Sequence, residues 1–299
     1  MDKIIRCITS DGAVMASVIN STDIVYTAQK LHSTSPAANA AIGRLLSAAS
    51  MMGAQLKQKS ATLTVRIKGD GPLGTLVTVA DSNGNVRGYL ENNTCETEHY
   101  RKGKINVSAA VGKNGYIDVM RDYGTGEPYM SRAELATGEI AEDITSYYVQ
   151  SEQIPTACGL GVLLDKDNGE VMLAGGFLIQ LLPGADDTAC DKLEKNIAAL
   201  EPMTTMLAKG MSVEEICRTA LQGFEVEIVD ELPVHYVCNC SRERVINSIA
   251  SLRNDEIQAM IDEDEGAEVV CNFCNKRYVF GADDLRQIIE LKAQNEAQK

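Results

Sequence analysis

The segment TLVTVADSNGNVRGYL (75–90) decides the class of fold. Apolar and β-branched residues lie on both sides of Asn83 and Gly84. Asn-Gly suits the positive φ angles of a type I′ turn, so the segment predicts a β-hairpin. A chain that begins with such hairpins builds antiparallel sheets, because a short turn can join only antiparallel neighbours.

Two more segments follow the same plan, and a further strand lies between the first helix and the first hairpin. They are INVSAAVGKNGYIDVMRD (105–122), GVLLDKDNGEVMLAGGFLIQ (161–180) and the alternating segment ATLTVRIKGDG (61–71). The first two contain Asn-Gly at 114–115 and 168–169 and predict hairpins, and the third predicts a strand. YGTGEP (123–128) is typical of a turn. Together these segments predict a largely antiparallel sheet.

Two helices accompany this sheet. SPAANAAIGRLLSAASMMGAQLK (35–57) starts with Ser35 as the expected N-cap and Pro36 at the first helical position. Its many small residues indicate close packing against the sheet. EIAEDITSYYVQSEQ (139–153) carries acidic residues in its first turns, which the helix dipole favours. The sequence therefore predicts an α+β core domain over residues 1–183.

Beyond Pro183 the strand pattern gives way to helical periodicity. We expect an amphipathic helical linker over 184–231, interrupted at Pro202 and Gly210, with a capping box formed by Ser212 and Glu215. Such short helices are marginal alone, so their apolar sides must pack on another surface, most simply the sheet domain. We expect the linker to stay ordered only while it is docked.

The last segment, 232–299, contains two pairs of cysteines in HYVCNCSRERV (235–245) and EVVCNFCNKRYVF (268–280). Four thiolates can complete a tetrahedral zinc shell, and Cys238, Cys240, Cys271 and Cys274 are the predicted ligands. His235 is a possible substitute, but four cysteines already suffice. A segment this short and this poor in large apolar residues usually needs a metal or disulfides to fold.

The spacing by itself is compatible with a plain structural zinc site or with a redox switch. Zinc keeps the sulfurs as thiolates, the form that oxidants attack, and each pair is close enough in sequence to form a disulfide. Zinc binding supplies about 10–16 kcal/mol of folding free energy in small zinc peptides. Oxidation would therefore release zinc, unfold the module and remove support from the linker.

The composition limits the kinds of partner. Lys and Arg number 28 against 42 Asp and Glu, and the net charge of −14 opposes binding to phosphate backbones and anionic membranes. We therefore expect neither a nucleic-acid nor a membrane partner. The N-terminus lacks the apolar region of a secretory signal, which predicts a cytoplasmic protein whose cysteines are kept reduced. The remaining cysteines, Cys7, Cys95, Cys158, Cys190 and Cys217, are expected to be unpartnered, buried apolar residues.

The whole chain resembles the bacterial redox-regulated 33 kDa chaperonins, the heat shock protein 33 family. The resemblance rests on the C-x-C and C-x-x-C pairs and on collinear segments such as TSPAANAAIGRLLSAASMMGAQLK, GDGPLGTLVTVADSNGNVRGYL, GEIAEDITSYYVQSEQ and GGFLIQLLPGA. It implies an ATP-independent holdase and not an enzyme. It implies one zinc ion in the reduced, inactive form, and disulfides Cys238–Cys240 and Cys271–Cys274 in the active form. It also implies unfolding client proteins as partners and a homodimer when oxidised.

Two other functions remain open at this point. A constitutive zinc module could bind RNA or a partner protein, with CNKRY (274–278) supplying some positive charge. A thiol oxidoreductase could use the C-x-x-C pair, although thioredoxin-like motifs begin a helix and Cys271 follows a predicted strand. Salt-sensitive RNA binding would favour the first, and catalytic disulfide reduction the second.

Overall fold

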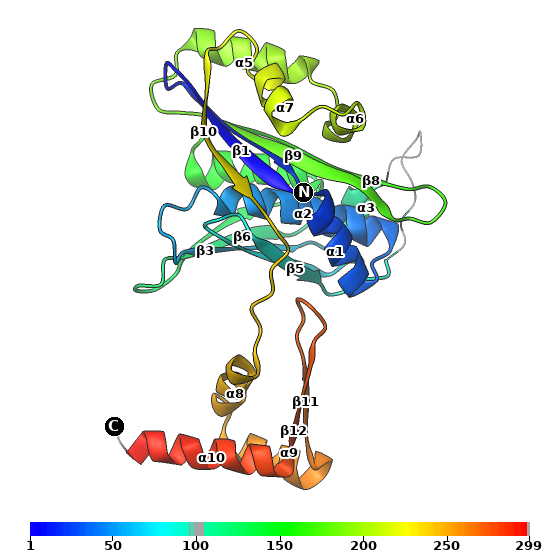
Figure 1. Cartoon of the computed structure of the whole chain (residues 1–299), viewed down its shortest axis with the longest axis vertical. Helices are drawn as coiled ribbons and strands as arrows, with labels where there is room; N and C mark the ends of the chain where they lie inside the picture. Colours follow the sequence, from blue (N-terminus) through cyan, green and yellow to red (C-terminus); the bar gives the residue numbers. More distant parts are fainter. Residues whose placement is uncertain (96, 98–104, 298–299) are drawn as a thin grey trace. The chain divides into compact units, whose positions relative to one another are not determined.

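The computed structural model describes residues 1–95, 97 and 105–297. The chain divides into two units, Met1–Val237 and Cys238–Lys299, which are described separately (Figure 1). No helix in the described part of the chain is long and apolar enough to cross a membrane.

One antiparallel sheet of the first unit contains the segment 75–90. Its strand order is β5-β4-β3-β6-β7, with β3 Thr62–Lys68, β4 Thr75–Asp81, β5 Val86–Leu90, β6 Tyr116–Asp122 and β7 Tyr129–Glu134. The β4–β5 hairpin turns at Asn83 and Gly84 as predicted, with Gly84 at φ +80°. Asp81 Oδ1 accepts hydrogen bonds from the backbone N–H groups of Asn83 and Asn85, which fixes the turn.

The second sheet combines strands from the N-terminal and C-terminal parts of this unit. Its order is β10-β1-β2-β9-β8, with β1 Lys3–Thr9, β2 Val14–Asn20, β8 Thr156–Leu164, β9 Val171–Leu181 and β10 Val226–Pro233. The β8–β9 hairpin confirms the predicted turn, and Gly169 has φ +70°.

The predicted hairpin around Asn114 and Gly115 is wrong. Residues Val107–Val111 form a short buried helix, α3, capped by the Asn106 side chain, which accepts the N–H of Ala109. Gly115 is needed for a close approach, since a Cβ there would lie 2.0 Å from the carbonyl O of Lys68. Strand β6 pairs instead with β7 across the turn predicted at 123–128.

Helices fill the space between the two sheets (Figure 1). They are α1 Thr22–His32, α2 Pro36–Gly53 and α4 Ile140–Tyr147, which continues as a π-helical turn, Tyr148–Glu152. Helices α2 and α4 confirm the predictions for 35–57 and 139–153. Almost every residue of α2 is buried in the shared core, so its Ala, Gly and Ser residues bring both sheets close to the helix axis. Ser35 is the N-cap residue, but its hydroxyl donates to the carbonyl O of Cys95.

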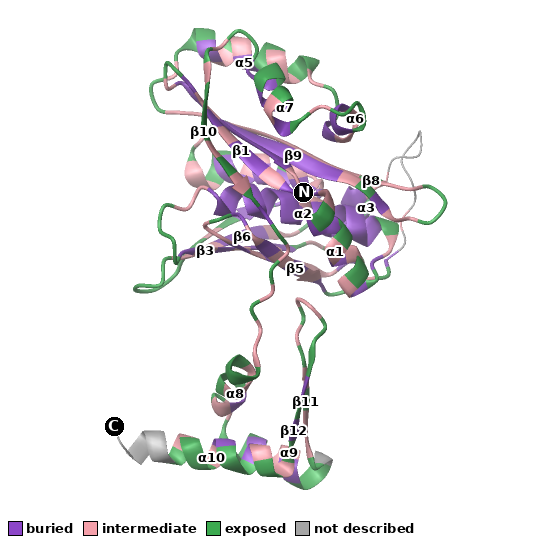
Figure 2. Cartoon of the chain, viewed as in Figure 1, coloured by how far each residue is buried: buried purple, intermediate pink, exposed green. Residues whose placement is uncertain are grey.

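The linker helices cover the opposite face of the second sheet. They are α5 Asp187–Ala199, α6 Met203–Ala208 and α7 Val213–Ala220. In Figure 2 these three helices lie along the second sheet and carry both buried and exposed residues. Side chains of all three helices share an apolar cluster with β1, β2 and β9, as the amphipathic pattern predicted.

The prediction that the strand pattern is absent up to residue 231 is wrong. Val226–Pro233 forms β10 at the edge of the sheet, and its register with β1 brings Lys3 to Glu231 and Arg6 to Asp230 as ion pairs. The second unit starts at Cys238, six residues beyond the expected 232. The division of the first unit into a core and a separate linker stays a prediction.

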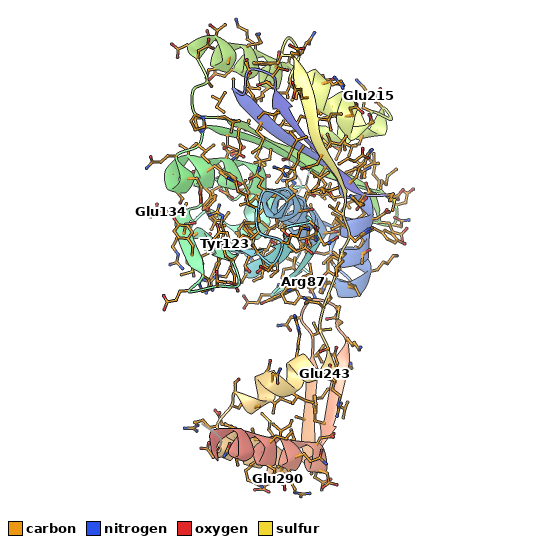
Figure 3. All side chains as sticks on the ribbon, turned by 60° about the vertical axis from the view of Figure 1, so that its left-hand side comes forward. Arg87, Tyr123, Glu134, Glu215, Glu243 and Glu290 are labelled. Carbon is orange, nitrogen blue, oxygen red and sulfur yellow. The ribbon has the colours of Figure 1, made fainter. Side chains whose placement is uncertain are left out.

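Replacing Ser212 by alanine should weaken the docked α7. The Ser212 hydroxyl accepts the N–H of Glu215, and the Glu215 carboxylate accepts the N–H of Ser212. Figure 3 labels Glu215 on this helix. Losing the cap should lower the free energy of unfolding by about 1 kcal/mol in urea denaturation. Glu215→Gln retains the reciprocal bond and should cost much less; equal losses would contradict the capping role.

The second unit consists of a β-hairpin and three helices. Its elements are α8 Arg242–Ala250, α9 Asn254–Asp264, β11 Gly266–Val270, β12 Arg277–Gly281 and α10 Ala282–Ala297. The buried core in its described residues is small and consists of Ile249, Ile257, Ile261, Tyr278, Phe280, Leu285 and Ile288. The predicted α+β fold, with antiparallel sheets, packed helices and a small cysteine-bearing C-terminal module, is confirmed.

Candidate metal centre

The four cysteines of the second unit lie in two local structures that present sulfur atoms. Cys238 and Cys240 immediately precede α8, whose N-cap Ser241 accepts the N–H of Arg244. Cys271 and Cys274 lie in the turn between β11 and β12. The Cys271 carbonyl accepts the N–H groups of Cys274 and Asn275, so the turn folds its two cysteines toward one side.

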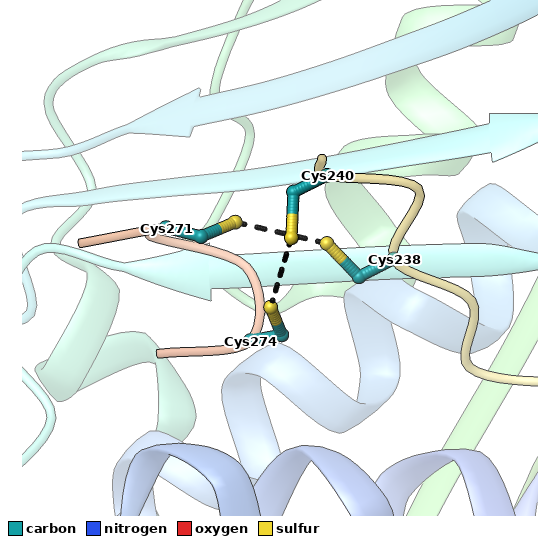
Figure 4. A group of neighbouring side chains, drawn as sticks. All are labelled: Cys238, Cys240, Cys271 and Cys274. Carbon is teal, nitrogen blue, oxygen red and sulfur yellow. Dashed lines mark hydrogen bonds between the residues drawn. The ribbon is translucent and has the colours of Figure 1, made fainter. Parts of the chain in front are cut away.

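The sulfurs converge closely enough to bind one ion. All four Sγ atoms lie within 4.8 Å of one another, and all four residues are partly exposed. Two close contacts join the two motifs: the sulfurs of Cys238 and Cys271 are 3.7 Å apart, and those of Cys240 and Cys274 are 3.4 Å apart (Figure 4). A tetrahedral ion with metal–sulfur bonds of about 2.3 Å separates its ligands by about 3.8 Å. The cluster therefore has the size of a four-thiolate metal site.

The protein environment shifts the pKa values of thiols in this cluster in different directions. Burial raises the pKa of Cys238 to about 12, and burial also raises the pKa of Cys274. For Cys240 burial acts in the same direction, but hydrogen bonds from Tyr278 and the neighbouring thiols outweigh it and lower the pKa to about 7. The Tyr278 hydroxyl lies 3.1 Å from Cys240 Sγ. Cys240 therefore supplies a thiolate to an incoming cation more readily than Cys238 or Cys274.

Comparison with known proteins places this centre in a family. The model of the family described as Hsp33 protein matches residues 2–281, which include both cysteine motifs. The chain belongs to the Hsp33 family.

Relatives agree over nearly the full length. The chain is 44% identical to a 33 kDa chaperonin of Acetivibrio thermocellus, covering 97% of each chain. It is 43% identical to one from Clostridioides difficile, over 97% of this chain and 99% of the relative. The crystal structure of the 33 kDa chaperonin of Thermotoga maritima superposes with a TM-score of 0.87 at 32% identity, over 98% of this chain and 99% of that chain.

Hsp33 proteins are chaperones and not enzymes, so the chain is a chaperone, and binding of unfolded proteins follows from that class. The structure brings together the four cysteines that the sequence singled out. His235 is not among them: its N–H donates to Asn85 and its carbonyl accepts the N–H of Val86, both in the first unit.

The prediction for the remaining cysteines is partly wrong. Cys7 on β1 and Cys217 on α7 are buried against each other, with their sulfurs 2.6 Å apart, and Cys158 and Cys190 are only partly buried. The Cys7–Cys217 pair is separated by 210 residues, so no spacing motif could reveal it. The only local signals were the inward position of Cys7 in an alternating strand and of Cys217 on the apolar side of a helix.

Proposed function

We propose that this Hsp33 protein is a redox-regulated, ATP-independent holdase of the cytoplasm. In the reduced form Cys238, Cys240, Cys271 and Cys274 hold one Zn²⁺ and the protein is inactive. Oxidants convert Cys238–Cys240 and Cys271–Cys274 into disulfides, zinc leaves, and the second unit and the linker helices unfold. The protein then dimerises and captures unfolding clients. The observation that carries this proposal is the convergence of four thiols in a unit with a small apolar core.

Zinc is the metal best suited to this donor set. Four sulfur ligands at tetrahedral spacing are typical of structural zinc, and carboxylates, which calcium and magnesium prefer, are absent from the cluster. Such sites hold all ligands deprotonated, so bound zinc keeps even the high-pKa Cys238 as a thiolate.

Loss of the ion should unfold the second unit because little else stabilises it. The binding free energy of structural zinc, about 10–16 kcal/mol in peptides, equals or exceeds the stability of a typical domain. A core of seven buried side chains in the described part of this unit cannot replace that contribution.

The chain itself connects the metal centre to the linker. Immediately before Cys238, the N–H of Val237 donates to Val86 and the carbonyl of His235 accepts from Val86. These bonds join the segment between β10 and Cys238 to the start of β5 in the other sheet, and β10, the edge strand of its own sheet, follows α7 along the chain. Unfolding that starts at Cys238 can fray this edge and then release the marginal helices packed on the sheet.

Release of those helices would uncover an apolar surface suited to unfolded chains. The cluster beneath them includes Val14, Val18, Phe177 and Ile179 of the sheet. The helices carry the complementary apolar residues, including Met203, Met206 and Ile216, and methionine side chains adapt to varied partners. Both surfaces can contribute to client binding.

Zinc content and client protection test the function together. The reduced protein should contain one zinc per chain and protect an aggregating client poorly. Peroxide with mild heat should release the zinc and produce strong protection without ATP. Zinc loss without protection would reject the holdase, while salt-sensitive RNA binding by the reduced form would favour a constitutive zinc module. A constitutive RNA-binding module is less favoured, because Arg277, which would supply positive charge to it, forms an ion pair with Glu268.

Tryptic mapping distinguishes the disulfide pairings that the cluster permits. Cleavage after Arg218, Arg242, Arg253 and Lys276 places each motif in its own peptide, 219–242 and 254–276. Disulfides within the motifs leave two separate peptides, each lighter by two hydrogen atoms. Disulfides between the motifs, along the short distances of the reduced form, join the peptides into one species and would contradict the proposed pairing.

Replacing Tyr278 by phenylalanine should weaken zinc binding at neutral pH by about tenfold, as removal of partners that support metal ligands does. The variant loses the hydrogen bond to Cys240, so the pKa of this thiol rises above about 7 and more protons must be displaced. Competition with a chromogenic chelator measures the affinity. The difference from wild type should shrink as the pH is raised; a constant difference would contradict a protonation effect.

A further inference from the structure

The buried thiol pair formed by Cys7 and Cys217 joins the two parts of the first unit that must separate during activation. Cys7 lies on β1 at 1% exposure, and Cys217 lies on α7 at 0%. Their sulfurs are 2.6 Å apart, about 0.6 Å more than the length of a disulfide bond. The two sulfurs are therefore close enough to react with each other while α7 is docked.

We propose that Cys7 and Cys217 form a second redox site, whose disulfide fastens α7 to β1 and opposes release of the linker. The inference rests on the proposed function for its consequence, because a fastened α7 keeps covered the apolar surface that activation exposes. Oxidation would then have two opposite effects on this chain, release at the four-cysteine centre and retention at this pair.

The chemistry requires a peroxide as oxidant and balances with water. The Cys7 thiolate attacks the peroxide and becomes a sulfenic acid, and the Cys217 sulfur then displaces hydroxide to form the S–S bond. Two electrons pass to the peroxide, and the protons of the two thiols end in two water molecules. The hydrogen bond from Cys217 lowers the pKa of Cys7, and the same contact raises that of Cys217, which agrees with Cys7 reacting first.

Burial determines when the bond can form. The two sulfurs are enclosed by apolar residues, including Ile5, Val213 and Ile216, so peroxide reaches them only during brief openings of α7. Once α7 has left the sheet the sulfurs are no longer neighbours. Cys7 is therefore oxidised during a brief opening and the S–S bond forms when α7 docks again, so slow, mild oxidation favours the bond over rapid oxidation with heat.

Tryptic mapping tests the bond directly, because each thiol lies alone in its peptide. Cleavage after Arg6 and Lys30 gives peptide 7–30, and cleavage after Lys209 and Arg218 gives peptide 210–218. The full-length protein oxidised slowly with peroxide should yield these two peptides joined, and reductant should separate them. If the four zinc-site cysteines oxidise fully and no joined peptide forms, the inference is overturned.

Native proteolysis tests the consequence without a chaperone assay. Cleavage after Arg218, within α7, requires the helix to open, and should be about tenfold slower in the joined form than in Cys7→Ala or Cys217→Ala treated identically. The cleavage rates of the reduced proteins measure any loss of packing that the substitutions cause. The effect of the S–S bond is therefore read only from the change in cleavage rate on oxidation. Cys190→Ala, on α5 of the same linker, should behave as wild type.

Equal cleavage of the joined and variant forms would overturn the retaining role. The outcome is independent of the proposed function: if oxidised, zinc-free protein holds no client, the holdase fails, while joined peptides and slower cleavage still establish the second redox site.

Discussion

Replacing Cys271 by serine should unfold the second unit and release the linker helices, and leave the two sheets of the first unit folded. Cys271 supplies one of four converging sulfurs, and a serine hydroxyl cannot replace a thiolate on zinc at neutral pH. The binding free energy of structural zinc is about as large as the free energy of unfolding of a whole domain. Losing the ion therefore removes more stability than the small apolar core of this unit can supply. The helical signal of α8, α9 and α10 should disappear from the far-UV circular dichroism spectrum.

A matched variant and a chelator complete this experiment. Cys190→Ser also changes a partly exposed cysteine, but outside the cluster, and should retain zinc and full helical content. Treating wild type with a strong zinc chelator should reproduce the Cys271→Ser spectrum. A Cys271→Ser protein that keeps its helices and resists protease from residue 238 onward would show that the metal does not maintain the fold.

Replacing Ile216 by aspartate should activate the reduced, zinc-loaded protein without any oxidant. Ile216 is fully buried between α7 and the sheet, where a carboxylate would have no partner. Burying such a charge without a partner costs at least about 3 kcal/mol, which opposes docking of this short helix. We expect α7 to detach and an unfolding client to be protected to a large fraction of the oxidised wild-type level.

The exposed side of the same helix provides the control. Thr219→Asp adds the same charge where water solvates it, and should change client protection little. Zinc content is measured for both variants, since activation must occur with the ion still bound. If α7 becomes protease-sensitive in Ile216→Asp and no client is protected, the surface beneath the linker is not the client-binding surface.

Patterns contained within a few residues predicted their structures correctly. The Asn-Gly turns at 83–84 and 168–169, the Pro-initiated α2 and the capping box of α7 depend on neighbouring residues. The segment 105–122 carried the same Asn-Gly signal and failed, because burial of Val107, Ala110 and Val111 as a capped helix outweighed the local preference. The strand β10 was missed because its pattern is weak and its ladder partner, β1, lies more than 200 residues earlier.

The metal centre could be predicted from local sequence patterns, whereas the buried thiol pair could not. Two cysteines two or three positions apart point to a shared ligand site from the sequence alone, since the intervening chain cannot carry them far apart. The sequence by itself therefore determined the α+β class, the amphipathic helices beyond Pro183 and the four-cysteine cluster. Only the tertiary structure decided that β10 closes the sheet edge, which face of which sheet the amphipathic helices cover, and that Cys7 meets Cys217. These three features arise from packing between segments distant in the chain, and no local propensity encodes which of many apolar surfaces will meet.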